Sequence, residues 1–153
     1  MTLTLHEIAL EETEKIVPVL LDADEDEDRI RRALADEGNT NYAAQESDEY
    51  VGAVTVKWEE HESEILYFAV IRELRGRGYG KLIIEVLTNE MYCRGVRSLV
   101  VGTANSSLDN IAFYQKCGFR MHHIRRDFFN YIQPPIRENG ILMRDMLVLR
   151  YET

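Results

Sequence analysis

Hydrophobic residues recur along the chain with two periods, one typical of strands and one of helices. A run of seven apolar residues at 65–71 predicts a buried strand. The apolar residues between positions 82 and 91 fall on one face of a helix, which is expected over 78–94. Gly95 ends that helix, and residues 98–103 predict the next strand. A strand, a helix and a strand in this order form a right-handed β-α-β unit, so the two strands should run nearly parallel.

The remaining segments extend this pattern toward both ends of the chain. Further strands are expected at 2–9, 42–45, 51–58, 119–129 and 141–151, and further helices at 11–23, around 30–34 and at 107–117. Pro18 falls inside the first helix and predicts a kink or two short helices. Residues 130–140 are expected to form a loop. The order β-α-α-β-β-β-α-β-α-β-β predicts an α/β fold in a single domain, 1–153, with a mixed sheet of about seven strands and four helices.

Composition limits the class of protein. The 153 residues include 45% hydrophobic residues and carry a formal net charge of −9, which argues against nucleic acid as a partner and mildly for a cationic one. No apolar run approaches 18 residues, so a membrane span is not expected, and the N-terminus lacks the pattern of a signal peptide. Cys93 and Cys117 are too few for a disulfide framework, which favours a cytoplasmic setting. No His or Cys spacing indicates a metal site.

A glycine-rich turn joins the 65–71 strand to the 78–94 helix. It consists of Arg75, Gly76, Arg77, Gly78, Tyr79, Gly80 and Lys81. Glycines let the backbone approach a ligand closely, and the first N–H groups of a helix have no partner within it. Together with three cationic side chains, they predict a site for phosphate oxygens. The alternative is a plain turn with solvated arginines.

The spacing of this turn excludes two common phosphate loops. Three residues separate Gly76 from Gly80, one fewer than a Walker loop needs, and Lys81 is followed by Leu82. The glycines form G-x-G-x-G, which is not the dinucleotide fingerprint. The remaining pattern, R-x-x-G-x-G from Arg75 to Gly80, resembles the acetyl-CoA pyrophosphate loop of the GNAT acetyltransferase superfamily.

A second motif strengthens this resemblance. Tyr114, Gly118 and Phe119 match the late helix of the superfamily, about thirty residues after the glycine-rich turn. The resemblance implies that the two central parallel strands splay apart and that acetyl-CoA is the co-substrate. It places the pantetheine arm on the strand edge formed by Phe68, Ala69 and Val70, and the pyrophosphate on the amides of 75–81. Ser107 stands where many relatives have Asn, so it is expected either to contact pantetheine or only to cap its helix.

The resemblance also implies transfer of an acetyl group from the thioester to an amine. Tyr114 is the candidate proton donor to the departing thiolate, because a phenol is protonated at neutral pH. Its other role would be aromatic packing on the sheet. Glu64, which precedes the central strand, is the candidate base, although an ordered water could serve instead. A backbone N–H near Val70 is expected to hold the oxyanion of the tetrahedral intermediate.

The acceptor pocket is expected to form from the 22–30 segment, the meander of strands between 42 and 71, and the 126–140 loop. Residues 22–28 hold six carboxylates, which favour a cationic amine or form a solvated loop. The loop adds aromatic and cationic residues that suit a carboxylate or form a solvated hairpin; these are Arg125, Arg126, Phe128, Phe129, Tyr131 and Arg137. The acceptor therefore stays open.

Three functions follow from these patterns. The first is acetylation of a primary amine on a small molecule or a peptide. The others are protein N-terminal acetylation and a CoA-binding sensor without turnover. The exposed edge of the last strand is compatible with a homodimer.

Overall fold

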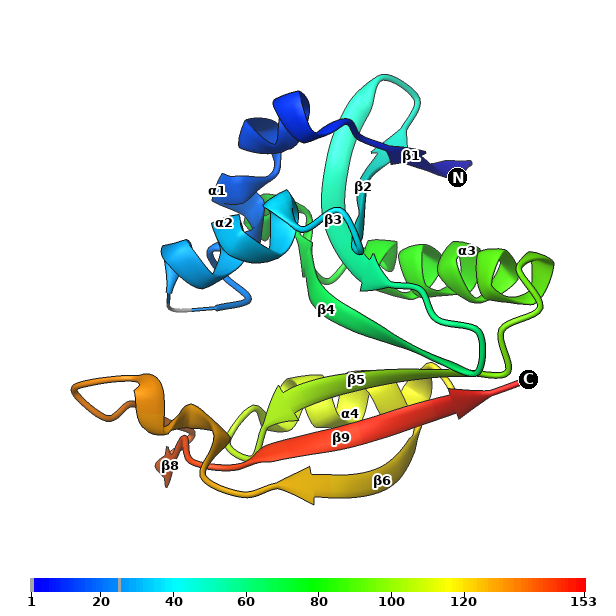
Figure 1. The fold of residues 1–153 in the computed structure, drawn as a ribbon. Helices are drawn as coiled ribbons and strands as arrows, with labels where there is room; N and C mark the ends of the chain where they lie inside the picture. Colours follow the sequence, from blue (N-terminus) through cyan, green and yellow to red (C-terminus); the bar gives the residue numbers. More distant parts are fainter. Residues whose placement is uncertain (1, 25) are drawn as a thin grey trace.

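A seven-stranded mixed sheet runs through the protein. The structure, a computed structural model, describes residues 2–24 and 26–153. The strands follow the order β1-β2-β3-β4-β5-β9-β6 across the sheet (Figure 1). Their bounds are β1 (Leu3–Glu7), β2 (Thr40–Glu46), β3 (Glu49–Lys57), β4 (Glu62–Val70), β5 (Ser98–Ala104), β6 (Arg120–Arg125) and β9 (Met146–Glu152). Among the described strands, only β4 and β5 pair in parallel, which confirms the predicted β-α-β unit.

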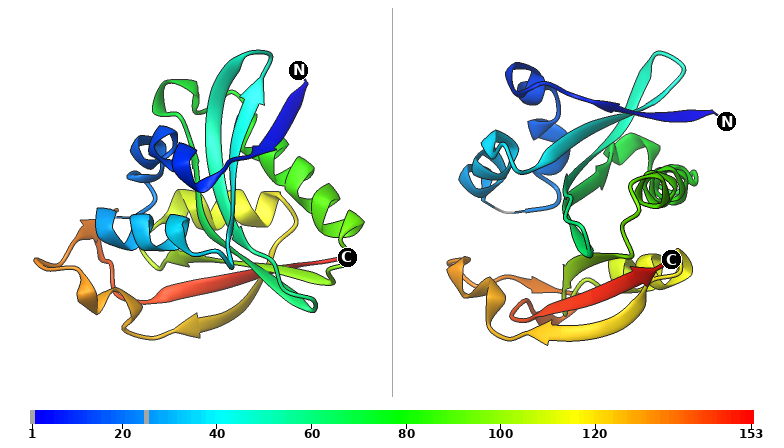
Figure 2. Two further views of the ribbon diagram at one scale, coloured as in Figure 1. Left: turned by 45° about the horizontal axis from the view of Figure 1, so that its top comes forward. Right: turned by 45° about the vertical axis from the view of Figure 1, so that its right-hand side comes forward.

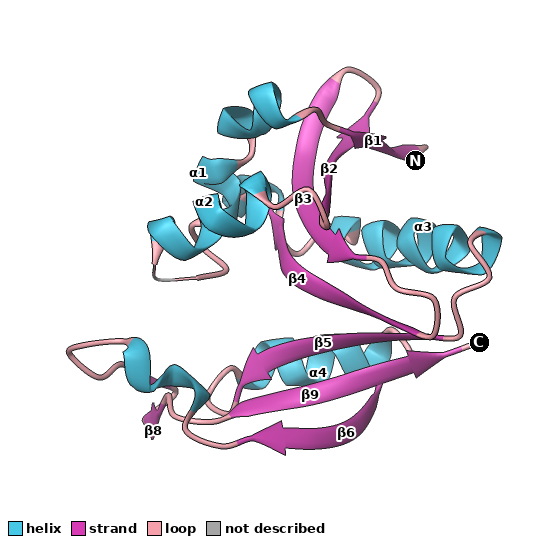
Figure 3. Ribbon diagram, in the orientation of Figure 1, coloured by secondary structure: helices cyan, strands magenta, loops and turns pink. Residues whose placement is uncertain are grey.

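Helices cover both faces of this sheet (Figure 3). The α-helices are α1 (Val17–Leu20), α2 (Glu27–Ala35), α3 (Tyr79–Cys93) and α4 (Leu108–Lys116), and short 3-10 helices lie at η1 (Leu10–Lys15), η2 (Arg72–Leu74) and η3 (Phe128–Tyr131). The α1 and α2 helices and α3 flank opposite sides of the N-terminal strands, as the right-hand view of Figure 2 shows. Within residues 2–24 and 26–153, no helix combines the length and apolar character needed to cross a lipid bilayer.

Alternating residues of the strands feed two separate cores. On β2, Tyr42 and Ala44 pack into the core beneath α3, whereas Ala43 packs into the core beneath α1 and α2. The helices complete these cores because their apolar residues repeat at helical spacing: Ile83, Leu87 and Met91 of α3 are fully buried. The sheet between the two cores is therefore held from both sides.

A β-bulge on β4 marks the point where the sheet divides. The pairing with β3 moves from Thr55↔Tyr67 to Val56↔Ile65, so Leu66 is an extra residue on β4. The parallel pairing with β5 ends at the same place, because its last pair is Ile65↔Val101. A bulge bends its strand and increases its twist. Beyond Ile65, β4 and β5 diverge (Figure 1), which confirms the expected splay between the central strands.

The structure differs from the expected elements near both ends. The expected helix at 11–23 is divided into η1 and α1. Pro18 lies in the first turn of α1, where a residue without a backbone N–H costs the helix no hydrogen bond. The expected strand at 119–129 ends at Arg125, because Asp127 adopts a left-handed φ of 56° and donates its N–H to Asp145. The expected strand at 141–151 starts only at Met146. A small hairpin precedes it, formed by β7 (Arg137–Glu138) and β8 (Ile141–Leu142).

Candidate active site

The diverging strands enclose a large cleft. Its volume is about 1190 Å³, and its walls come from β4, the glycine-rich turn, β5 and α4 at one end, and from α2, η3 and the chain between β6 and β9 at the other. Every predicted catalytic or cofactor-binding residue that the structure describes lines this cleft except Arg77. The β4 edge facing β5 lacks a strand partner beyond Ile65 among the described residues. Its backbone groups are therefore available to a ligand.

The glycine-rich turn presents backbone N–H groups at the start of α3. Gly76 and Gly78 have φ values of 79° and 90°, which residues with a Cβ rarely adopt. Leu82 donates its N–H to the Gly78 carbonyl, so the N–H groups of the preceding helical residues have no acceptor within the helix. A Cβ on Gly80 would lie 3.1 Å from the ring of Phe113. The turn is thus a positively polarised end of α3 that faces the cleft and suits an anion.

The arginine side chains of this turn are engaged in other contacts or are not part of the cleft wall. Arg75 donates from Nε to the Val70 carbonyl at 3.1 Å and from Nη2 to Asp22 at 2.9 Å. Asp22 also accepts from Arg72 at 2.9 Å. Lys81 lines the cleft, whereas Arg77 is not among the described residues of its wall. The amides, rather than the arginine side chains, are therefore the groups most directly available to an anion.

Tyr114 lies in an aromatic cluster at the wall of the cleft. It is 7% exposed, and its ring centroid is 5.2 Å from that of Phe113, 5.6 Å from that of Phe119 and 6.5 Å from that of Phe68. Burial raises the pKa of Tyr114, and the neighbouring Cys117 adds to this effect. The phenol therefore stays protonated at neutral pH and can donate a proton or a hydrogen bond.

Glu64 lies on β4 just before the bulge. Its carboxylate is 3.4 Å from Nη1 of Arg125 on β6, and its side chain is 28% exposed. The extra residue at Leu66 changes the alternation of β4, because Ile65 and Phe68 pack into the same core whereas Tyr67 packs into the opposite one. Glu64 consequently points to the side of Tyr67, the side of α1 and α2.

Ser107 occupies the N-cap position of α4 without capping it through its side chain. No hydrogen bond from a described backbone N–H reaches its hydroxyl, which instead donates to Glu138 at 2.5 Å. Ser106 donates to the same carboxylate at 3.2 Å. The expectation of a side-chain cap is therefore wrong, because the hydroxyl is turned toward Glu138 of β7, where it donates to a charged carboxylate, and does not accept from an N–H group of α4. Ser107 still lines the cleft.

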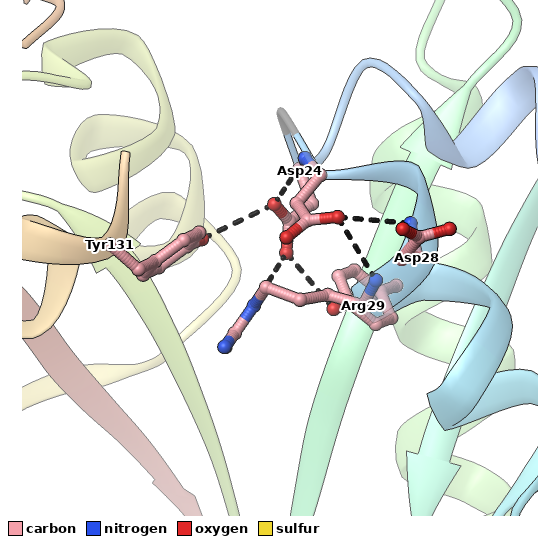
Figure 4. A network of polar contacts seen from close by, with 6 residues as sticks. Asp24, Asp28, Arg29 and Tyr131 are labelled. Atoms are coloured by element: carbon pink, nitrogen blue, oxygen red, sulfur yellow. Dashed lines mark hydrogen bonds and ion pairs between the residues drawn. The ribbon is translucent and has the colours of Figure 1, made fainter. Parts of the chain in front are cut away.

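A polar cluster that the sequence did not reveal lies at the other end of the cleft (Figure 4). The Asp24 carboxylate accepts hydrogen bonds from the Tyr67 hydroxyl at 3.0 Å, the Tyr131 hydroxyl at 3.2 Å and the Asp26 N–H at 2.9 Å. The Arg29 guanidinium lies 4.1 Å from the centroid of the Tyr131 ring. The expected segments 22–30 and 126–140 thus do meet, and Tyr67 of the central strand joins them. A tyrosine inside an apolar strand is the signal that could have indicated a partner for its hydroxyl.

Both phenols of this cluster are held in the protonated form. Burial raises the pKa of Tyr131 to about 12, with a further contribution from the Asp24 carboxylate. Burial and then Asp24 also raise the pKa of Tyr67. The two hydroxyls therefore act as donors to Asp24 at neutral pH. Within residues 2–24 and 26–153, no three His, Cys, Asp or Glu side chains gather closely enough to hold a metal ion.

Comparison with known proteins identifies the family. The sequence profile of the acetyltransferase (GNAT) family matches residues 3–119. The uncharacterized N-acetyltransferase YvbK of Bacillus subtilis is 34% identical over 145 residues, which are 94% of this chain and 92% of that protein. The chain belongs to the GNAT acetyltransferase family. Its relatives and its fold are those of acetyltransferases of this family.

Two solved structures show how closely this GNAT fold is shared. An acetyltransferase from Elizabethkingia anophelis, crystallised with acetyl-CoA bound, is 31% identical and superposes with a TM-score of 0.89 over 99% of this chain and 98% of that one. A Bacillus subtilis acetyltransferase in complex with CoA is 32% identical, with a TM-score of 0.88 and 99% of each chain covered. The family profile ends at residue 119, so the acceptor-side loop between β6 and β9 lies outside it.

Proposed function

We propose that the whole chain, 1–153, acts as one acetyltransferase domain that transfers the acetyl group of acetyl-CoA to a primary amine of a small molecule or a peptide. The observation that carries this proposal is the single cleft that joins the open edge of β4 to the start of α3 and to Tyr114. Relatives of this chain that were crystallised with acetyl-CoA and with CoA support it.

The donor end of the cleft fits the parts of acetyl-CoA. The amides of residues 76–81 bind the pyrophosphate at the start of α3, with Lys81 adding charge. Phe68, Ala69 and Val70 provide the strand edge along which the pantetheine amides bond. Across the cleft, the Ser107 hydroxyl can contact pantetheine only if it shares or leaves its bond to Glu138.

The acceptor ammonium loses two protons in the reaction, one before the attack and one from the nitrogen of the tetrahedral intermediate, and the departing thiolate gains one. The amine nitrogen attacks the thioester carbonyl carbon, and Glu64 takes the proton of the amine directly or through a water molecule. The resulting tetrahedral intermediate holds a negatively charged oxygen, which a backbone N–H near Val70 stabilises. The carbon–sulfur bond then breaks, and Tyr114 donates a proton to the departing thiolate. The products are the N-acetylated amine and CoA.

Two measurements test this proposal. Calorimetry should show CoA binding to the purified protein, and thiol release from acetyl-CoA should depend on an added amine. An absence of measurable CoA affinity would overturn the assignment. CoA binding without thiol release across polyamines, aminoglycosides, amino acids and short peptides would indicate a sensor. Release only with peptides that match a protein N-terminus would indicate protein N-terminal acetylation.

A further inference from the structure

The acceptor end of the cleft carries a group of arginines in an otherwise acidic protein. Arg29 and Arg32 of α2 line this end, and Arg125 lines it from β6. The net charge of −9 would by itself favour a cationic acceptor. Charges next to a bound ligand interact with it more strongly than the distant charges of the protein do. They are closer to the ligand, and less water lies between. These arginines therefore decide which ligand fits.

Arg29 is held in a fixed position by its neighbours. Its guanidinium carbon is 4.1 Å from the Tyr131 ring centroid and 5.7 Å from that of Phe128, so the planar group is stacked on η3. Figure 4 shows its side chain extending from α2 toward the C-terminal half of the molecule. The neighbouring Arg31 instead pairs with Glu14 and Glu27 and is not among the described residues of the cleft wall.

Asp24, the carboxylate nearest to Arg29, leaves the Arg29 guanidinium with unused hydrogen-bond donors. Asp24 accepts hydrogen bonds from Tyr67, Tyr131 and the Asp26 N–H, and its side chain is only 7% exposed. An Asp24 oxygen is 3.5 Å from Nε of Arg29, which is buried, and among the described residues the two terminal nitrogens of the guanidinium make no hydrogen bond. The Arg29 side chain remains 34% exposed. A stacked guanidinium in this state matches a planar carboxylate, which it can bind through two parallel hydrogen bonds.

The spacing between the Asp24 cluster and the proposed base along β4 suits a small molecule. Tyr67, which bonds the Asp24 cluster, follows Glu64 by three residues on β4, or about 10 Å along the strand. The side chains of Glu64 and Arg29 both reach into this space, since both line the cleft. Apolar side chains of the same cleft come from Phe128, Phe129, Ile132 and Met143.

We propose that the acceptor is an apolar amino acid, whose carboxylate binds Arg29 with the help of Arg32 while its amine faces Glu64. This assignment rests on the proposed acetyl transfer and names its substrate class. Arg29 is then the residue that determines specificity. It excludes polyamines, because their additional ammonium groups would be placed against a stacked guanidinium.

The test compares matched acceptors in a thiol-release assay. L-Leucine and L-phenylalanine are each assayed beside their amides and their decarboxylated amines, which keep the amine and the apolar group. We expect kcat/KM for the free acid to exceed that for the amide at least tenfold. Arg29→Gln should bring this ratio close to one, mainly by raising KM for the acid, with KM for acetyl-CoA unchanged. Arg31→Gln, on the same helix, should leave the ratio as it is.

Several outcomes would contradict the assignment. Equal use of the acid, amide and decarboxylated amine would overturn it, and so would equal behaviour of Arg29→Gln and Arg31→Gln. If thermal unfolding shows that Arg29→Gln does not fold, Arg32→Gln and Arg29→Lys are used instead. Each should lower the ratio of kcat/KM for the acid to that for the amide, and an unchanged ratio in both overturns the assignment. Absence of thiol release with every amine overturns the proposed function itself, whereas release only with amines lacking a carboxylate overturns this inference alone.

Discussion

At the scale of single residues, the two proposed catalytic groups differ in their surroundings. Tyr114 is enclosed by aromatic rings, and burial keeps its phenol protonated. Glu64 is partly exposed and pairs with Arg125 across the cleft. The sequence could place Tyr114 because a local motif surrounds it. It could not place Arg125 opposite Glu64, since the two are 61 residues apart and meet only through the order of the strands.

Replacing Tyr114 by Phe tests its role as proton donor. The change keeps the ring and its packing but removes the hydroxyl. We expect kcat to fall about 100-fold, the low end of what general acid catalysis contributes, while calorimetry shows unchanged CoA affinity. A variant as fast as the wild type would remove Tyr114 from the mechanism.

Replacing Glu64 by Gln tests its role as base. Removal of the carboxylate should lower kcat/KM more than about tenfold near pH 7, where the amine is mostly protonated. The loss should shrink at higher pH, because the amine then loses its proton to solvent. A loss below about tenfold at pH 7 would show that an ordered water, rather than Glu64, accepts the proton.

At the scale of elements, the glycine-rich turn and α3 were predictable because their signals are local. The apolar spacing of α3 and the glycines before it are close in the sequence. The bulge at Leu66 has no such signal. Simple alternation along β4 would place Glu64 on the same side as Phe68, and the extra residue reverses this. The side of the sheet that Glu64 faces could therefore be learned only from the pairing of β3 with β4.

The two ends of α3 offer a matched test of the anion site. Gly78 precedes the helix with φ 90° and Gly95 follows it with φ 71°, and no atom lies within 4 Å of a Cβ added at either position among the described residues. Alanine at each should lower the free energy of unfolding by about 1–2 kcal/mol, the cost of a left-handed backbone. Only Gly78→Ala should weaken CoA binding in calorimetry. Equal CoA affinity in the two variants would contradict a phosphate site at the start of α3.

At the scale of the whole molecule, the Asp24 cluster connects the halves that the splay separates. Tyr131 and Asp24 are 107 residues apart in the sequence. The N–H of Asp127 is likewise fixed by Asp145, and Asn105 accepts from the N–H groups of Arg144 and Asp145. The overall fold was predictable from the order of elements. These tertiary hydrogen bonds, however, end β6 already at Arg125 and let β9 start only at Met146. Periodicity does not contain that information.

Stability at high pH should report the buried phenols. Burial raises the folded-state pKa of Tyr114 above the unfolded value near 10, so its contribution to stability is complete below about pH 10 and is lost as the pH rises further. The free energy of unfolding, measured with urea, should fall by about 1.4 kcal/mol per pH unit from this group alone. Tyr114→Phe should show a shallower decline than the wild type. Tyr92→Phe, at a position that is 69% exposed, should match the wild type; identical slopes in all three proteins would contradict the burial of Tyr114.

The connection between α1 and α2 contacts residues at both ends of the cleft. Asp22 binds Arg75 beside the proposed phosphate site, and Asp24, two residues later, binds the tyrosines of the proposed acceptor site. A diphosphate that attracts Arg75 competes with Asp22 for it and so acts on the segment that positions Asp24. We therefore expect the two ligands to be thermodynamically linked. Each should change the dissociation constant of the other by the same factor, and Asp22→Asn should bring that factor close to one.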